Sequence, residues 1–123
     1  MDQNWMVLLQ DQNLIEKVLE TNQTSGQYGL VLTEQDAKLI LKEHANSLRE
    51  QKRIEFGDSV IPRIIYEFCD SDYLEQSSYA ASIIRLQEIF YMYKNEMQDE
   101  ITDDELLHLM KEQFEKLKEL CWR

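Results

Sequence analysis

Apolar residues recur three and four positions apart along nearly the whole chain, and this spacing is typical of amphipathic helices. Two of the repeats follow directly after a capping-box sequence, Thr33–Asp36 and Thr102–Glu105, whose side chains can satisfy free amides at a helix N-terminus. Only 3 Gly and 1 Pro occur in 123 residues, which is too few for the turns of an all-β fold. The sequence therefore predicts an all-α fold.

The repeats divide the chain into about five helices, which we expect to form one helical domain over residues 1–123. In the fourth helix the apolar positions extend around much more than one stripe, so this long helix should lie at the centre of the bundle. A loop over residues 24–29 should separate the first two helices, and a minor two-strand contact could join residues 30–32 and 54–56. The expected helices span about residues 14–19, 33–48, 59–70, 78–97 and 102–121.

The charge of the chain excludes several kinds of partner. It carries 13 basic and 24 acidic residues, which gives a formal net charge of −11. Such a charge repels nucleic-acid phosphates and anionic membrane surfaces, so we expect no direct contact with either, whereas a basic protein is a suitable partner. The N-terminus lacks a basic segment followed by a long apolar run, and we therefore expect a cytoplasmic protein without a secretory signal or membrane span.

Residues suited to binding a metal are sparse. Cys69 and Cys121 have no second Cys or His at ligand spacing beside them. Glu105 and His108 share one helix face, as in di-iron bundles, but those sites require the motif twice and further glutamates. His108 lies opposite the apolar stripe of its helix, so we interpret it as a solvated side chain. We expect no metal and no cofactor.

No catalytic residue can be assigned, because the sequence contains no phosphate-binding loop and no nucleophile beside a base. His44 is unusual because it falls within an apolar stripe, with Ile40 and Ala45 as neighbours. It is either a core or interface histidine that holds one hydrogen bond or part of a ligand-binding pocket. Glu55 could form a buried ion pair with Arg53 or another neighbour, or contact a ligand. The residues that could line such a pocket are His44, Glu55, Tyr66 and Tyr79.

Five short segments, spread over about residues 14–114, carry a resemblance to a known family. They are Gln27–Thr33, Arg53–Gly57, Phe68–Tyr73, Ile89–Glu96 and Asp103–Leu106. In this order they resemble an uncharacterised domain-of-unknown-function family of small proteins from clostridia-like bacteria, although the C-terminal residues 116–123 depart from the family pattern. The resemblance implies a bacterial cytoplasmic protein and no particular activity, cofactor or functional residue.

We therefore expect a non-enzymatic module for protein interaction or regulation, with a protein partner or self-association. Tyr91, Met92 and Tyr93 follow one another on the fourth helix and cannot all face one core, so they are the candidate interface. Trp5 and Trp122, near the termini, could add apolar surface. Two alternatives are a small-ligand binder or enzyme with a pocket near His44, and an acidic mimic of nucleic acid that occupies a basic protein's groove.

Overall fold

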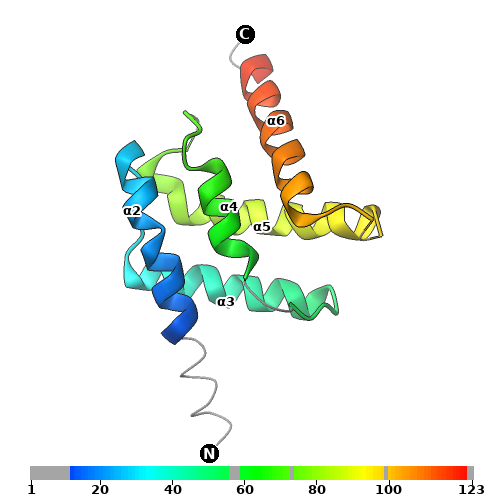
Figure 1. Cartoon of the computed structure of the whole chain (residues 1–123), viewed down its shortest axis with the longest axis horizontal. Helices are drawn as coiled ribbons and strands as arrows, with labels where there is room; N and C mark the ends of the chain where they lie inside the picture. Colours follow the sequence, from blue (N-terminus) through cyan, green and yellow to red (C-terminus); the bar gives the residue numbers. More distant parts are fainter. Residues whose placement is uncertain (1–11, 56–58, 73, 99, 122–123) are drawn as a thin grey trace, which may run out of the picture.

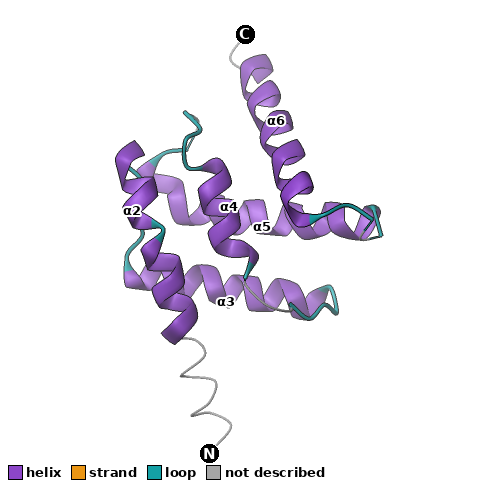
Figure 2. Ribbon diagram, in the orientation of Figure 1, coloured by secondary structure: helices purple, strands orange, loops and turns teal. Residues whose placement is uncertain are grey.

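The computed structural model describes residues 12–55, 59–72, 74–98 and 100–121, with side chains up to residue 116. Within these ranges the regular elements are all helical and no strand occurs (Figure 2). Residues 12–20 are helical, and they are followed by α2 (Asn22–Ser25), the 3-10 turn η1 (Gly26–Tyr28), α3 (Glu34–Glu50), α4 (Val60–Phe68), the 3-10 turn η2 (Gln76–Ser78), α5 (Tyr79–Glu96) and α6 (Asp103–Cys121). The predicted all-α fold is confirmed.

The helices pack around α5, which contacts α3, α4 and α6. α3 and α5 lie side by side and run in the same direction, while α4 crosses α5 on one face (Figure 1). α2 contacts α4, and Ile15 and Val18 of the N-terminal helical segment belong to the hydrophobic core. α6 leaves the end of α5, contacts α4 and α5, and projects with its C-terminal half beyond the other helices (Figure 1).

Capping side chains begin three of the helices, two of them at the predicted capping boxes. At α3 the Thr33 hydroxyl accepts a hydrogen bond from the Asp36 amide at 3.1 Å, and the Asp36 carboxylate accepts from the Thr33 amide at 3.0 Å. Ser59 accepts in the same way from the amide of Ile61 at the start of α4. At α6 the Thr102 hydroxyl accepts from the Glu105 amide at 3.2 Å and donates to the Glu105 carboxylate at 3.0 Å.

Two predictions for residues 24–32 were wrong. The expected loop over residues 24–29 is largely helical, since α2 and η1 cover residues 22–28 before Gly29 turns the chain with a φ of +80°. Residues 30–32 and 54–55 form no strand, and residue 56 of the expected contact lies outside the described residues. Side-chain amides bind the backbone groups of residues 31 and 32 instead. The Asn22 amide binds both backbone groups of Leu32, at 2.8 and 2.9 Å. Gln76 binds those of Val31, at 2.7 and 2.8 Å.

The core lies where α4 crosses α5. Four side chains of α4, those of Ile61, Ile64, Ile65 and Phe68, are completely buried. α5 and α3 add large apolar groups to this core, and α6 contributes Leu106, Leu107 and Met110. Ala45, which we expected in the apolar stripe of α3, is exposed. It follows the buried His44, and successive helical residues are about 100° apart around the axis, so its side chain turns away from the core.

The connection between α5 and α6 is held by a buried lysine. Lys94 donates to the Ile101 carbonyl at 2.8 Å and pairs with the Asp103 carboxylate at 2.8 Å. Its ammonium group therefore binds the loop and the acidic first turn of α6 together.

In the part of the chain that the structure describes, no helix has the length and apolar character needed to span a membrane.

Candidate functional site

His44 lies in the middle of α3, and its ring is buried against α5. Its Nδ1 is 3.0 Å from Oε1 of Gln87, and its Nε2 is 3.0 Å from Oε1 of Glu55. The Gln87 amide nitrogen points the other way and donates to the Ser47 hydroxyl at 2.8 Å. Both ring nitrogens therefore face acceptor oxygens, and both donate in the imidazolium form of His44.

Glu55, in the connection between α3 and α4, binds three groups with one carboxylate. Oε1 accepts from His44, and Oε2 accepts from the Tyr91 hydroxyl and from the Val60 backbone amide, each at 3.0 Å. Val60 is the first residue of α4, so the carboxylate also lies at the positive end of that helix. Glu55 thus joins α3, the connection, α4 and α5.

The pKa values of His44 and Glu55 shift in the directions expected of an ion pair. Burial lowers the pKa of His44, but the hydrogen bonds and charge of its neighbours, Glu55 first, outweigh burial and raise the pKa above its usual 6.5. Burial raises the pKa of Glu55, and the contacts with His44, Val60 and Tyr91 outweigh it, so that the pKa falls below 4.5. Burial and the adjacent Glu55 charge raise the pKa of Tyr91, which remains a neutral donor.

Tyr91 covers the ion pair on its α5 side. Its ring stacks on the His44 ring with 5.7 Å between centroids and an interplanar angle of 24°. The Arg53 guanidinium lies 5.7 Å from the centroid of the Tyr91 ring, and its Nε donates to the Asn95 side chain at 2.9 Å. The Tyr91 ring therefore contacts both the His44 ring and the Arg53 guanidinium between α3 and α5.

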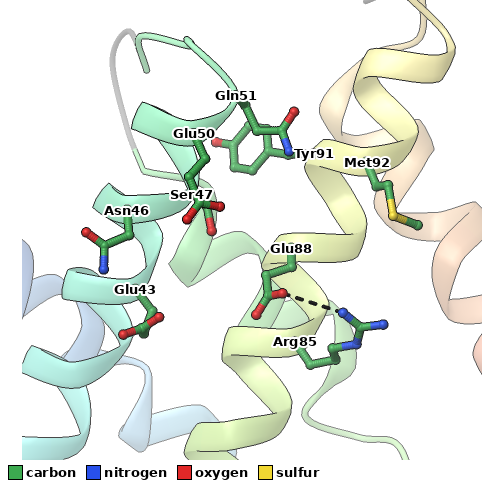
Figure 3. Close-up of a pocket in the computed structure, with 9 residues that line it drawn as sticks. All are labelled: Glu43, Asn46, Ser47, Glu50, Gln51, Arg85, Glu88, Tyr91 and Met92. Carbon is green, nitrogen blue, oxygen red and sulfur yellow. Dashed lines mark hydrogen bonds and ion pairs between the residues drawn. The ribbon is translucent and has the colours of Figure 1, made fainter.

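A polar pocket with a volume of about 260 Å³ opens at the surface beside this cluster, between α3 and α5 (Figure 3). Ser47 and Tyr91, which belong to the buried network, also form part of its wall. Arg85 pairs with Glu88 at 3.5 Å at its edge, as Figure 3 shows. The lining residues are Glu43, Asn46, Ser47, Glu50, Gln51, Arg85, Glu88, Tyr91 and Met92.

The structure brings together two of the four residues predicted to line a pocket. His44 and Glu55 are in direct contact, and His44 forms two hydrogen bonds where we expected one. Tyr66 is exposed on α4. Tyr79 is buried at the start of α5, where its hydroxyl faces Ser25 without a hydrogen bond of good geometry, and burial raises its pKa to about 12. In the part of the chain that the structure describes, neither tyrosine forms a hydrogen bond or a ring contact with His44.

Gln87 and Ser47 are the site residues that sequence reasoning missed. Gln87 is completely buried. It lies four residues after Ile83 and three before Phe90, both of them buried on the core side of α5. A polar residue at such a position requires a buried partner, and this was the available signal. Ser47 lies three residues after His44 on α3, so the two side chains share one helix face and Ser47 could have been named as a neighbour of His44.

The three residues of the candidate interface face different surroundings. Tyr91 is buried by the contacts described above, whereas Met92 is half exposed at the rim of the polar pocket. Tyr93 lies in a second hollow, an apolar groove of about 300 Å³ between α5 and α6. The groove is lined by Tyr93, Met97, Leu106, Leu109, Met110 and Gln113. Trp5 and Trp122 lie outside the described residues.

His108 is solvent-exposed, as predicted, and lies between two carboxylates, 3.5 Å from Glu67 and 3.3 Å from Glu112. Among the described residues, no group of three or more His, Cys, Asp or Glu side chains is arranged to hold a metal ion. Cys69 is buried, and burial together with the adjacent Asp70 raises the pKa of its thiol. The side chain of Cys121 lies outside the described part.

The model of a family of unknown function, DUF6323, matches residues 17–119. No curated protein and no solved structure gives a significant match.

Proposed function

The chain belongs to DUF6323, a family of unknown function, and we propose that it is a protein-interaction module. Its binding site is the apolar groove between α5 and α6, and its partner is a protein that presents an amphipathic helix with basic residues beside the apolar face. The function is that of an adaptor or regulator without chemistry of its own.

One observation carries this proposal, the gathering of large exposed apolar side chains along the groove. Tyr93, Met97 and Leu109 keep 37, 38 and 43% of their surface exposed, and all three line the same hollow. Burial of apolar surface is favourable by about 25 cal/mol per Å², so a partner that covers these side chains gains affinity from them. Contiguous exposed apolar surface is typical of interaction sites.

The shape of the groove favours a helix as the occupant. Two helices form its walls, and a third helix can lay apolar side chains spaced three and four residues apart between them. Met97 and Met110 have flexible, unbranched side chains that can adapt to a partner of irregular shape.

The charge of the partner follows from acidic residues that are close in sequence to the groove residues. Glu96 is the last residue of α5 and directly precedes Met97, and Glu105 and Glu112 are one helical turn on either side of Leu109 on α6. The chain as a whole carries a formal net charge of −11. Basic residues beside the partner's apolar face would therefore speed association and fix its orientation, while the apolar contacts supply most of the affinity.

The probe for a test is a fluorescent amphipathic peptide of leucine and lysine, whose binding to the full chain is measured by anisotropy. Leu109→Glu should weaken binding at least tenfold, because a charge then lies in the groove. Leu39→Glu is the matched control, since Leu39 is similarly exposed at 47% but lies on α3, and it should leave binding unchanged. Circular dichroism of both variants verifies the fold.

Three outcomes would contradict the proposal. Equal loss of binding in both leucine variants would place the peptide elsewhere on the surface. Equal binding of a peptide with the same lysines but no leucines would indicate attraction by charge alone, as expected of an acidic nucleic-acid mimic. Self-association of the wild-type chain that Leu109→Glu abolishes would identify a second copy as the occupant.

A further inference from the structure

The buried ion pair is connected to the surface pocket by a directed chain of hydrogen bonds. His44 Nε2 donates to Glu55, His44 Nδ1 donates to Gln87 Oε1, and the Gln87 amide nitrogen donates to Ser47 Oγ, at 3.0, 3.0 and 2.8 Å. Ser47 lines the pocket. Because Ser47 accepts from Gln87, its own hydroxyl proton is available to a group in the pocket.

Gln87 can reverse this chain without movement of the backbone. A primary amide has an acceptor on one side and a donor on the other, and rotation about the terminal side-chain bond exchanges the two. Gln87 is completely buried and has one partner on each side. The reversed orientation therefore satisfies its amide only if His44 becomes an acceptor and Ser47 a donor.

Loss of the His44 proton supplies that change. An ionised Glu55 can only accept, so the proton on Nε2 stays and the proton on Nδ1 passes to base in the solvent. The Nδ1 lone pair then faces the Gln87 oxygen at 3.0 Å, an arrangement of two acceptors that is unfavourable in a buried site. Rotation of the amide places a donor against Nδ1 and its oxygen against Ser47.

We infer that deprotonation of His44 reverses the side-chain amide of Gln87 and thereby converts Ser47 from a donor available to the pocket into a donor committed to Gln87. The charge state of a buried histidine thus sets the hydrogen-bonding character of the pocket wall. A ligand group that accepts a hydrogen bond from Ser47 would bind in the protonated state and be rejected in the neutral one.

The other charged groups around the pair leave His44 as the one that titrates. From the connection between α3 and α4, Glu55 faces the His44 ring and Arg53 contacts the ring of Tyr91. From α5, Tyr91 stacks on the ring, and Asp103 at the start of α6 acts on Tyr91 from a distance. α4 contributes only the Val60 amide to Glu55. Glu55 remains ionised and Tyr91 neutral as the pH rises, because the pKa of Glu55 is lowered and that of Tyr91 is raised.

Nitrogen NMR of the full chain with labelled histidine tests the inference directly, because it distinguishes the two neutral tautomers of His44. We expect the doubly protonated ring to lose the proton of Nδ1 and the neutral ring to carry its proton on Nε2. The carbon shift of Ser47 Cβ should follow the same titration, while that of Ser77, in η2, should not. A neutral ring protonated on Nδ1, or a Ser47 shift independent of the His44 titration, would overturn the inference.

Two variants separate the relay from general effects on the fold. Gln87→Met removes the amide but keeps the length of the side chain, so the pKa of His44 should fall by about one unit and Ser47 should no longer respond. Asn46→Ala removes another amide of the pocket wall, one that contacts Arg49, and should leave both titrations unchanged. A Ser47 response that persists in Gln87→Met would overturn the inference. If Gln87→Met does not fold, the tautomer of the neutral His44 ring and the Ser47 response in the wild-type chain test the inference.

Discussion

The neighbours of His44 favour its charged form in a buried site because they replace the water that the ring loses. Glu55 and Gln87 accept from its two nitrogens, and Tyr91 covers the face of its ring. A buried ion pair gains little over a well-packed apolar pair, but removal of one partner leaves the other charge without compensation. The stability of the fold should therefore depend strongly on each member of the pair.

Replacement Glu55→Gln should lower the free energy of unfolding by about 3 kcal/mol, because it leaves the imidazolium without its counter-charge and places an amide donor among donors. Urea unfolding near neutral pH measures this loss. Glu50→Gln, at the exposed end of α3, is the matched control and should change stability by less than about 0.5 kcal/mol. A similar effect of the two substitutions would argue against a buried charge on His44.

The ion pair should also give the stability a defined pH dependence. The pKa of His44 is raised in the fold, so its contribution is complete below 6.5 and is lost as the pH rises through the raised pKa. The pKa of Glu55 is lowered, so its contribution is complete above 4.5 and is lost as the pH falls through the lowered pKa. The pair therefore stabilises the fold most between pH 4.5 and 6.5.

The measurement is the difference in unfolding free energy between the wild type and a double variant, His44→Gln with Glu55→Gln, across the pH range. The other acidic residues titrate alike in both proteins, so their effects cancel in the difference. The difference in unfolding free energy should be greatest between pH 4.5 and 6.5 and should decrease below and above this range. A difference that does not vary with pH would show that the pair is not ionised.

At the scale of elements, local sequence determines where the helices begin. Thr33 and Thr102 cap α3 and α6 as their sequences predict, because each cap depends only on a residue three positions away. Ser59 caps α4 in a similarly local way, two residues from the amide that it binds. The segment before α3 was mispredicted for the opposite reason. Its backbone is satisfied by Asn22 and Gln76, and Gln76 lies 45 residues from the Val31 that it binds. A partner at that distance leaves no local pattern.

Thr33→Ala should destabilise the fold by about 1 kcal/mol, since the Asp36 amide at the start of α3 loses its acceptor. Thr33→Ser keeps the hydroxyl and should retain most of the stability. Thermal unfolding followed by far-ultraviolet circular dichroism compares the two variants with the wild type. Equal melting temperatures for the alanine and serine variants would mean that the cap contributes little.

At the scale of the whole molecule, the site arises from the packing of α3 against α5. His44 and Gln87 are 43 residues apart, and Glu55 and Tyr91 are 36 apart. Helical periodicity indicated which face of each helix is apolar, and it placed His44 on such a face. It contains no information on which positions of two helices meet, so Glu55 was found as a single candidate while Gln87 and Ser47 were not. The groove between α5 and α6 was hidden for the same reason.

The same packing predicts unequal stability along the chain. α4 lies in the core, whereas α6 contacts α4 and α5 and its C-terminal half projects beyond the other helices (Figure 1). Within α6, Phe114 packs edge-on against Phe68 of α4 with 5.8 Å between ring centroids. Segments with few buried contacts open without unfolding of the whole domain.

Amide hydrogen exchange should therefore be slowest in α4 and in the middle of α5, and fastest among the helices in the C-terminal half of α6. Phe114→Ala removes the ring that attaches this half to α4, so it should accelerate exchange in α6 while the protection of α4 changes little. Tyr66→Ala, an exposed aromatic residue on α4, is the control and should affect neither helix. Uniform protection of α4 and α6, or equal acceleration of both by Phe114→Ala, would mean that α6 unfolds only together with the core.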